Sequence, residues 1–162
     1  KIWLDSEVNR GTTIYFSLPV EVIPPPIRVV EFTKPRIDWK NINVLIVEDE
    51  EVNYLYLEKI IMEKKAGTIR AHNGKEAVDI CRNNADIDVI LMDLQMPVMD
   101  GYEATKLIKQ FRSDIPVIAQ TAYAQNDDRQ KMVRSGFNDY VVKPVTKKRL
   151  IQIIEQSLRS EI

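Results

Sequence analysis

Short apolar runs and stretches of helical spacing alternate along the chain from Asn41 onward. The apolar runs have the length of strands and lie at residues 44–47, 88–92, 116–120 and 140–142, with a weaker run at 68–71. Between them, apolar side chains recur three and four positions apart, as at Ala104, Leu107, Ile108 and Phe111. The pattern predicts five strand–helix units over residues 41–162. Such units form an α/β domain, in which a doubly wound parallel sheet carries helices on both faces.

Two further β-rich runs lie at the start of the chain. "KIWL" and "TTIYFSLP" flank the polar segment "DSEVNRG", which predicts a short β-hairpin within residues 1–18. Because an isolated two-stranded hairpin is only marginally stable in water, we expect this one to be the last part of a larger sheet.

A proline-rich segment follows the predicted hairpin. Residues 19–40 hold five of the eight prolines. Proline fixes φ and has no N–H, so the segment can form neither a continuous helix nor a central strand, and its "PPP" favours an extended spacer. We therefore predict a linker over residues 19–40.

Charge and composition narrow the function classes. The 23 basic and 24 acidic side chains give a net charge of -1, so no global field draws the chain to nucleic acid or to an anionic membrane. Cys81 is the only cysteine, which excludes an intrachain disulfide and suits a reducing compartment. No apolar run approaches the length of a membrane span. We expect a cytoplasmic segment without direct membrane contact, and the start at Lys1 in place of Met favours a piece of a longer polypeptide.

Carboxylates stand where two of the apolar strands end. The run 44–47 leads into Glu48 and Asp49, and the run 88–92 leads into Asp93. The carboxyl ends of parallel strands meet at one edge of a sheet, so we expect these three side chains to converge. They would repel one another unless a cation lay among them, and Mg²⁺ prefers such oxygen ligands. The sequence therefore predicts a magnesium site, with Mn²⁺ as the alternative ion.

Two more strand ends supply complementary groups. The strand at 116–120 leads into the hydroxyl of Thr121, and the strand at 140–142 leads into the ammonium of Lys143. A carboxylate nucleophile, a metal ion, a hydroxyl and a lysine are the groups needed to accept a phosphoryl group, since its negative oxygens must be neutralised during transfer. The predicted product is an aspartyl phosphate on Asp93.

Four separated motifs in order, "VEDEEVN", "LMDLQMPVMDG", "TA" and "DYVVKP", make residues 41–162 resemble the receiver domain of two-component response regulators. The resemblance implies a flavodoxin-like sheet with strand order 2-1-3-4-5. It also implies roles for single residues, which follow from their positions in the motifs. The phosphoacceptor is Asp93, the acidic metal pair is Glu48 and Asp49, the metal-binding backbone carbonyl belongs to Gln95, the switch residues are Thr121 and Tyr140, and the catalytic lysine is Lys143, with a cis bond before Pro144.

The N-terminal segment carries a second, shorter resemblance. "DSEVNRGTTIYFSLPV" is similar to the closing strands of the ATP-binding domain of sensor histidine kinases. Together the two resemblances imply the receiver of a hybrid sensor histidine kinase, whose parent protein is anchored in the inner membrane. The implied partners are the kinase core, in the same or a partner chain, and a histidine phosphotransfer protein or downstream regulator. By itself the receiver would catalyse only its own phosphorylation and dephosphorylation.

Three alternatives stay open at this point. A phosphohydrolase that uses an aspartyl phosphate would need a second aspartate two residues after Asp93, where this chain has Gln95. A pseudo-receiver would bind partners without phosphate, and a stand-alone regulator would have no kinase segment. Two other polar residues are not assigned to the site. Asp100 is interpreted as the N-cap of a helix, and His72, the only histidine, as a surface residue.

Overall fold

The computed structural model describes residues 1–7, 10–17, 37–122 and 126–159. These residues belong to two compact units, 1–36 and 37–162, which are described separately. Most of the predicted linker, namely residues 19–36, lies outside the described residues.

The first unit contains the predicted β-hairpin. Strands β1 (Ile2–Glu7) and β2 (Gly11–Phe16) pair in antiparallel register. On one face Trp3 lies opposite Tyr15, and their rings stack with centroids 5.5 Å apart. The apolar side chains on the other face are exposed and belong to Ile2, Leu4, Ile14 and Phe16.

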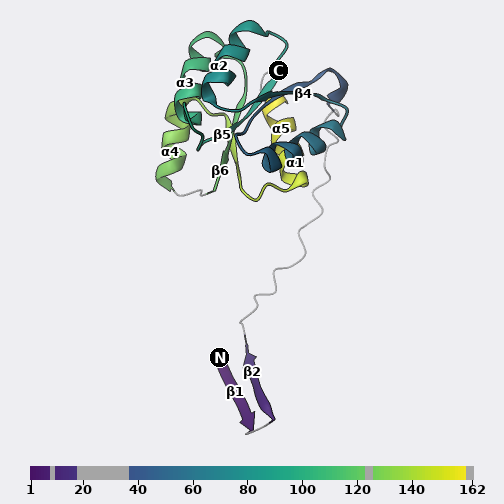
Figure 1. The fold of residues 1–162 in the computed structure, drawn as a ribbon, viewed down its shortest axis with the longest axis vertical. Coiled ribbons are helices and arrows are strands. Elements are labelled where there is room, and N and C mark those ends of the chain that lie inside the picture. The colour runs from purple at the N-terminus through teal and green to yellow at the C-terminus, as the bar shows by residue number, and fades with distance from the viewer. Residues whose placement is uncertain (8–9, 18–36, 123–125, 160–162) are drawn as a thin grey trace. The chain divides into compact units, whose positions relative to one another are not determined.

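The second unit is the predicted α/β domain. Its strands are β3 (Asn43–Val47), β4 (Gly67–Ala71), β5 (Val89–Asp93), β6 (Val117–Thr121) and β7 (Asp139–Val142). Its helices are α1 (Glu51–Met62), α2 (Gly74–Asn83), α3 (Gly101–Phe111), α4 (Asn126–Ser135) and α5 (Lys147–Arg159). All neighbouring strands are parallel, in the order β4-β3-β5-β6-β7 (Figure 1). Counted within this sheet, the order is 2-1-3-4-5, as predicted.

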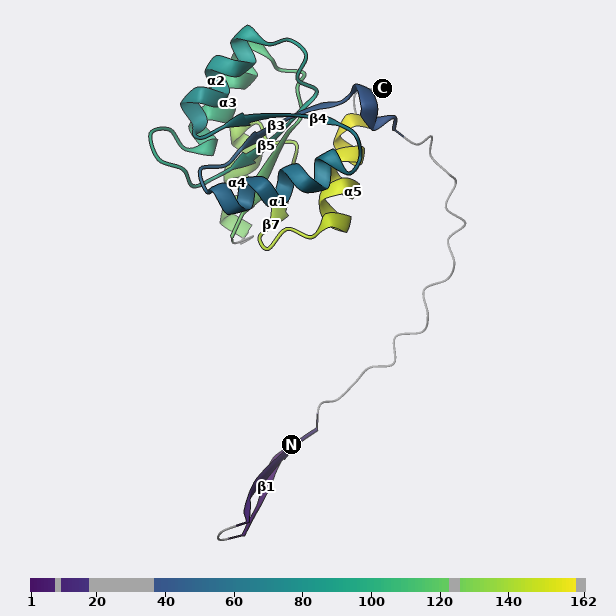
Figure 2. The same ribbon diagram turned by 45° about the vertical axis from the view of Figure 1, so that its right-hand side comes forward.

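The helices divide between the two faces of the sheet. Helices α2, α3 and α4 pack on one face and α1 and α5 on the other (Figure 2). Along β3, Leu45 and Val47 face the first layer, while Val44 and Ile46 face the second. Because both faces are covered, the central strands need apolar side chains at every position, which explains their unbroken apolar runs.

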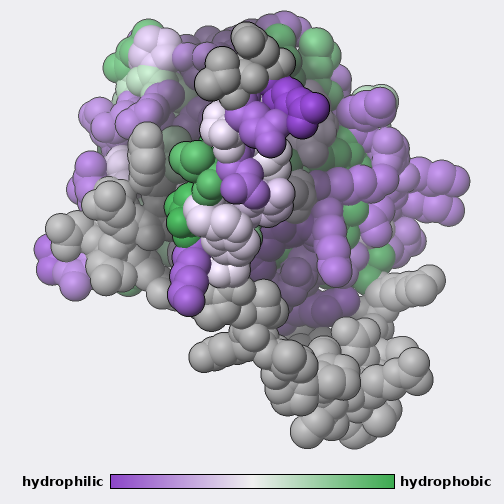
Figure 3. Space-filling model, turned by 90° about the horizontal axis from the view of Figure 1, so that it is seen from below, coloured by the Kyte–Doolittle hydropathy of each residue, from purple (hydrophilic) through white to green (hydrophobic). Residues whose placement is uncertain are grey.

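The coloured part of the face seen in Figure 3 is mostly hydrophilic, and apolar residues form smaller groups on it. Within the described part of the chain, no helix has the length and apolar character that crossing a membrane requires.

The α/β unit begins at Ile37, which is earlier in the chain than the start predicted from the strand pattern, residue 41. A short 3₁₀ helix, Trp39–Asn41, puts the Trp39 side chain into the layer of α1 and α5, where only 5% of it is exposed. Its indole Nε1 donates to Oε1 of Glu155 at 3.1 Å, and Nζ of Lys64 lies 5.3 Å from the ring centroid. The burial of one tryptophan thus adds the end of the predicted linker to the domain.

Replacing Trp39 by Ala is expected to lower the free energy of unfolding of the α/β unit by about 3 kcal/mol, because it removes a large buried side chain. Trp39→Phe keeps most of the packing and loses the hydrogen bond to Glu155, so we expect a loss of about 1 kcal/mol. Urea unfolding followed by circular dichroism measures both. An unchanged midpoint for Trp39→Ala would show that this segment does not belong to the folded unit.

Candidate functional site

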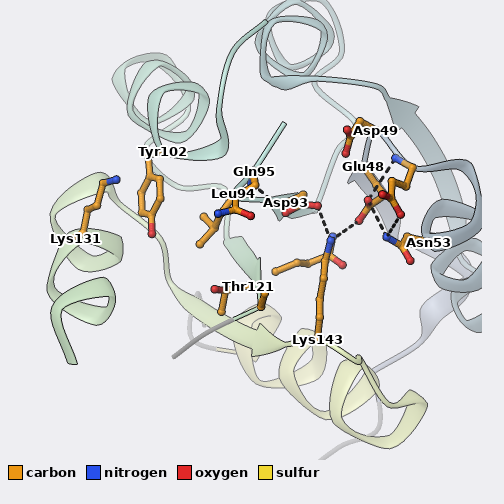
Figure 4. Close-up of a pocket in the computed structure, with 13 residues that line it drawn as sticks. Glu48, Asp49, Asn53, Asp93, Leu94, Gln95, Tyr102, Thr121, Lys131 and Lys143 are labelled. Atoms are coloured by element: carbon orange, nitrogen blue, oxygen red, sulfur yellow. Dashed lines mark hydrogen bonds and ion pairs between the residues drawn. The ribbon is translucent and has the colours of Figure 1, made fainter. Parts of the chain in front are cut away.

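The carboxyl ends of four strands form one cavity at the edge of the sheet. Val47 pairs with Met92, so Glu48 and Asp93 leave adjacent strands at the same level. Thr121 ends β6, and Lys143 follows the last residue of β7. The cavity has a volume of about 450 Å³, and these side chains point into it from neighbouring strands (Figure 4).

Lys143 joins the two buried carboxylates. Its Nζ lies 2.5 Å from Oδ2 of Asp93 and 3.0 Å from Oε2 of Glu48. Glu48 is fully buried, and Asp93 is 6% exposed. Their other oxygens accept from amides: Oε1 of Glu48 from Nδ2 of Asn53 at 3.2 Å, and Oδ1 of Asp93 from the backbone N–H of Gln95 at 3.1 Å. Both carboxylates are therefore fixed in direction by hydrogen bonds on each side.

Burial and charge shift two pKa values at this site. Burial raises the pKa of Glu48, with a further increase from the charge of Asp93, and the hydrogen bond from Lys143 only partly opposes the shift. Burial works against the charge on Lys143, but the hydrogen bonds to Asp93 and Glu48 outweigh it and raise the Lys143 pKa. Lys143 therefore stays protonated at neutral pH and supplies a permanent positive charge between the carboxylates.

Three carboxylates form an arrangement that suits a divalent cation. Single oxygens of Glu48, Asp49 and Asp93 lie within 4.8 Å of one another. Asp49 is exposed at the mouth of the cavity, whereas Glu48 and Asp93 lie inside it. Hard oxygen donors with access to solvent match the preference of Mg²⁺, which keeps several of its waters. The donor set is consistent with the predicted magnesium site.

The structure brings together six of the seven predicted site residues. Glu48, Asp49, Asp93, Gln95, Thr121 and Lys143 all line the cavity. Tyr140 is half-buried, packs against the layer of α2, α3 and α4, and lines a separate depression beside α4. The peptide bond between Lys143 and Pro144 is cis, as predicted.

Seven further residues line the cavity, and sequence reasoning did not assign four of them, Asn53, Tyr102, Gln120 and Lys131, to the site. Asn53 closes the motif "VEDEEVN" and lies in the first turn of α1, so its position in the motif was the available signal. Tyr102 follows Gly101 at the start of α3, and Lys131 belongs to α4. Neither is next to a strand end, so no local pattern indicates that they reach the site.

The loop from β5 to α3 runs close beneath the site. A Cβ added at Gly101 would lie 2.1 Å from the carbonyl oxygen of Asp93, so only glycine fits there. Asp100 caps α3, as predicted, because its Oδ1 accepts from the backbone N–H of Glu103 at 2.8 Å. Val98 has φ 70°, which is an unfavourable conformation for a β-branched residue.

We expect Val98→Asn to raise the free energy of unfolding by about 1 kcal/mol, because asparagine tolerates a positive φ and valine does not. Val98 is 79% exposed, so little packing is lost. Val52, which is 78% exposed in α1, provides the matched control, and Val52→Asn should change stability by less than about 0.5 kcal/mol. Urea midpoints compare the two variants, and equal changes would argue against strain at Val98.

Known proteins similar to this chain agree with the geometry. Residues 44–155 match the family described as "Response regulator receiver domain". The polar-differentiation response regulator DivK of Brucella anthropi is 39% identical over 118 residues, which cover 72% of this chain and 95% of DivK. The hybrid signal transduction histidine kinase I of Dictyostelium discoideum is 34% identical over 123 residues, covering 71% of this chain and only 7% of that kinase.

A similar domain of known structure supports the fold and itself holds a magnesium ion. The receiver domain of the Pseudomonas aeruginosa sensor histidine kinase PA1611, whose structure has a magnesium ion coordinated in the active site cleft, is 32% identical to this chain. The TM-score is 0.68, and the match covers 74% of this chain and 98% of that domain. The likeness thus extends over nearly the whole of a magnesium-binding domain.

Proposed function

The chain belongs to the response regulator receiver domain family, and from this we propose that Asp93 accepts a phosphoryl group from a phosphohistidine. The observation that carries the proposal is the position of Asp93. Its carboxylate ends a central strand, lies in an open cavity, and has Lys143 Nζ 2.5 Å from one oxygen.

In the proposed reaction a carboxylate oxygen of Asp93 attacks phosphorus. The new O–P bond forms as the P–N bond to the imidazole breaks, and the imidazole leaves with the electron pair. Lys143 neutralises one oxygen of the transferred group, because its ammonium already lies beside Asp93. The hydroxyl of Thr121, at the end of the next strand, can donate to another oxygen.

The proposed metal ligands are the carboxylates of Glu48, Asp49 and Asp93 and the backbone carbonyl of Gln95. Mg²⁺, or Mn²⁺ in its place, would supply positive charge to the phosphoryl oxygens when bound. Glu48 and Asp93 are preorganised for this, since Asn53 and the Gln95 amide hold one oxygen of each in place.

We further propose that phosphorylation shifts the domain between two surfaces. Thr121 would move toward the phosphoryl oxygens, and Tyr140, near α4, would turn inward to change the surface that partners bind. Tyr140 lies on β7, the strand at one edge of the sheet, where it is half-buried and lines the depression beside α4.

For the wider context we propose a hybrid sensor histidine kinase that operates at the cytoplasmic side of the inner membrane. The hairpin would then be the end of the kinase's ATP-binding domain, and residues 19–40 its linker to the receiver. Its partners would be the kinase core and a histidine phosphotransfer protein or downstream regulator. This proposal is supported by the likeness of the chain to part of a hybrid kinase. DivK, which is similar to the chain to a comparable degree, consists of little more than the receiver domain, so such domains also occur outside kinases.

Phosphoramidate, whose P–N bond resembles that of phosphohistidine, tests the proposed chemistry. With Mg²⁺ present we expect one phosphoryl group per chain and no repeated turnover of p-nitrophenyl phosphate. Rapid multiple turnover would favour the phosphohydrolase. A chain that takes up no phosphoryl group, yet binds its partner equally as wild type and as Asp93→Asn, would be the pseudo-receiver.

A further inference from the structure

The phosphoacceptor cavity has a second end, away from the metal-binding carboxylates. Figure 4 shows Tyr102 and Lys131 on the opposite side of Asp93 from Asp49 and Asn53. Tyr102 comes from the first turn of α3 and Lys131 from α4. The same two residues also line a shallower cavity over the β5–α3 loop, so they stand where the two cavities meet.

Tyr102 and Lys131 form a cation–π pair. Nζ of Lys131 lies 3.9 Å from the centroid of the Tyr102 ring. The ring is itself held by an edge-on contact with Phe137, whose centroid is 5.8 Å away. An ammonium over an aromatic face is attracted by the negative charge of that face. Both side chains line the far end of the cavity, with Tyr102 between Lys131 and Asp93 in the view of Figure 4, although Lys131 is exposed.

The two lysines of the cavity differ in what surrounds them. Lys143 is shared between Glu48 and Asp93. Among the residues whose side chains the structure describes, which leave out 126–129 of α4, no carboxylate forms an ion pair with Lys131. The charge of Lys131 is therefore available to an anion in the cavity, at the end that lacks the acidic cluster.

We infer that Lys131, positioned by Tyr102, is a specificity-determining residue that favours phosphodonors with an anionic leaving group, namely acyl phosphates. This inference rests on the proposed phosphoryl transfer to Asp93. A donor whose phosphoryl group lies at Asp93 has its leaving group in the remainder of the cavity, which extends to Tyr102 and Lys131.

The two classes of small phosphodonor differ in the charge of their leaving group. With acetyl phosphate, an oxygen of Asp93 bonds to phosphorus, the P–O bond to the acyl group breaks, and acetate leaves with the electron pair as an anion. With phosphoramidate protonated on nitrogen, the P–N bond breaks and neutral ammonia leaves. A nearby ammonium stabilises the first leaving group and not the second, so Lys131 should separate the two donors.

The test compares the apparent second-order rate constants of phosphorylation by acetyl phosphate and by phosphoramidate, with Mg²⁺ and at constant ionic strength. For Lys131→Gln we expect the acetyl phosphate constant to fall about fivefold and the phosphoramidate constant to change less than about twofold. Lys131→Arg should retain the wild-type ratio of the acetyl phosphate constant to the phosphoramidate constant. Tyr102→Leu should lower this ratio, as Lys131→Gln does. Lys106→Gln removes one exposed charge from α3 outside the cavity and should leave both constants unchanged.

An unchanged ratio in Lys131→Gln, with wild type phosphorylated by both donors, overturns this inference and leaves the proposed function intact. Equal loss with both donors also overturns it, because Lys131 would then act without regard to the leaving group. A wild type that neither donor phosphorylates contradicts the proposed function, and the inference fails with it. Melting temperatures of the variants establish that each is folded.

Discussion

Asp93→Asn is expected to abolish phosphoryl uptake, with the rate from acetyl phosphate falling at least about 10³-fold. The amide has no negative charge with which to attack phosphorus, and it removes one of the three carboxylates of the proposed metal site. Asparagine has nearly the same shape, so the hydrogen bond that Oδ1 accepts from the Gln95 amide can persist. The rate is measured with radiolabelled acetyl phosphate and Mg²⁺, and hydroxylamine sensitivity of the label identifies an acyl phosphate.

Asp100→Asn is the matched control for this prediction. Asp100 lies in the same loop, and its carboxylate caps α3, a role that asparagine fills equally well. The variant makes the same change of one charge and should be phosphorylated at the rate of the wild type. Substantial labelling of Asp93→Asn, or equal loss in the two variants, would mean that Asp93 is not the acceptor.

Lys143→Met is expected to slow phosphorylation about 10²-fold, because it removes the positive charge nearest to the attacked phosphorus. Lys143 also separates Glu48 and Asp93, so its loss leaves two buried carboxylates facing each other. Without Mg²⁺ we expect the free energy of unfolding to fall by about 2 kcal/mol, less than for a fully buried pair because 27% of the lysine side chain is exposed. Phosphorylation rates and urea midpoints, each with and without Mg²⁺, measure these effects.

Lys147→Met serves as the control for Lys143→Met. Lys147 pairs with Glu63 on the exposed surface, outside the cavity. Its replacement removes the same side chain and should leave the phosphorylation rate unchanged. If Lys143→Met retained the wild-type rate while Mg²⁺ still bound, the lysine would have no part in the transfer.

Much of the fold was predictable because the two patterns that indicate it, unbroken apolar runs for strands and helical spacing for helices, are local in the sequence. The runs around Leu45 and Ile90 are apolar at every position, since these strands are covered on both faces, and the helices between them repeat at helical spacing. The chemistry was predictable for a geometric reason. Parallel strands end at one edge, so Glu48, Asp93 and Thr121 could be expected to meet without knowledge of their distances.

The features that escaped prediction depend on contacts between distant segments. Trp39 follows a proline-rich stretch, and only its packing near Glu155 makes it part of the domain. Tyr102 and Lys131 meet because α3 and α4 are neighbours, which no spacing along the chain reveals. The positive φ of Val98 is likewise set by the loop around it, since valine itself disfavours that conformation.

The most direct test of the central claim is to locate the phosphoryl group. The wild-type chain is incubated with acetyl phosphate with and without Mg²⁺, treated with borohydride to convert any acyl phosphate to an alcohol, digested, and sequenced by mass spectrometry. We predict a single converted residue, Asp93, and only when Mg²⁺ is present. Conversion at another carboxylate, a phosphoryl group on His72, or the absence of any modification together with no binding of beryllium fluoride would contradict the assignment of Asp93 as the phosphoacceptor.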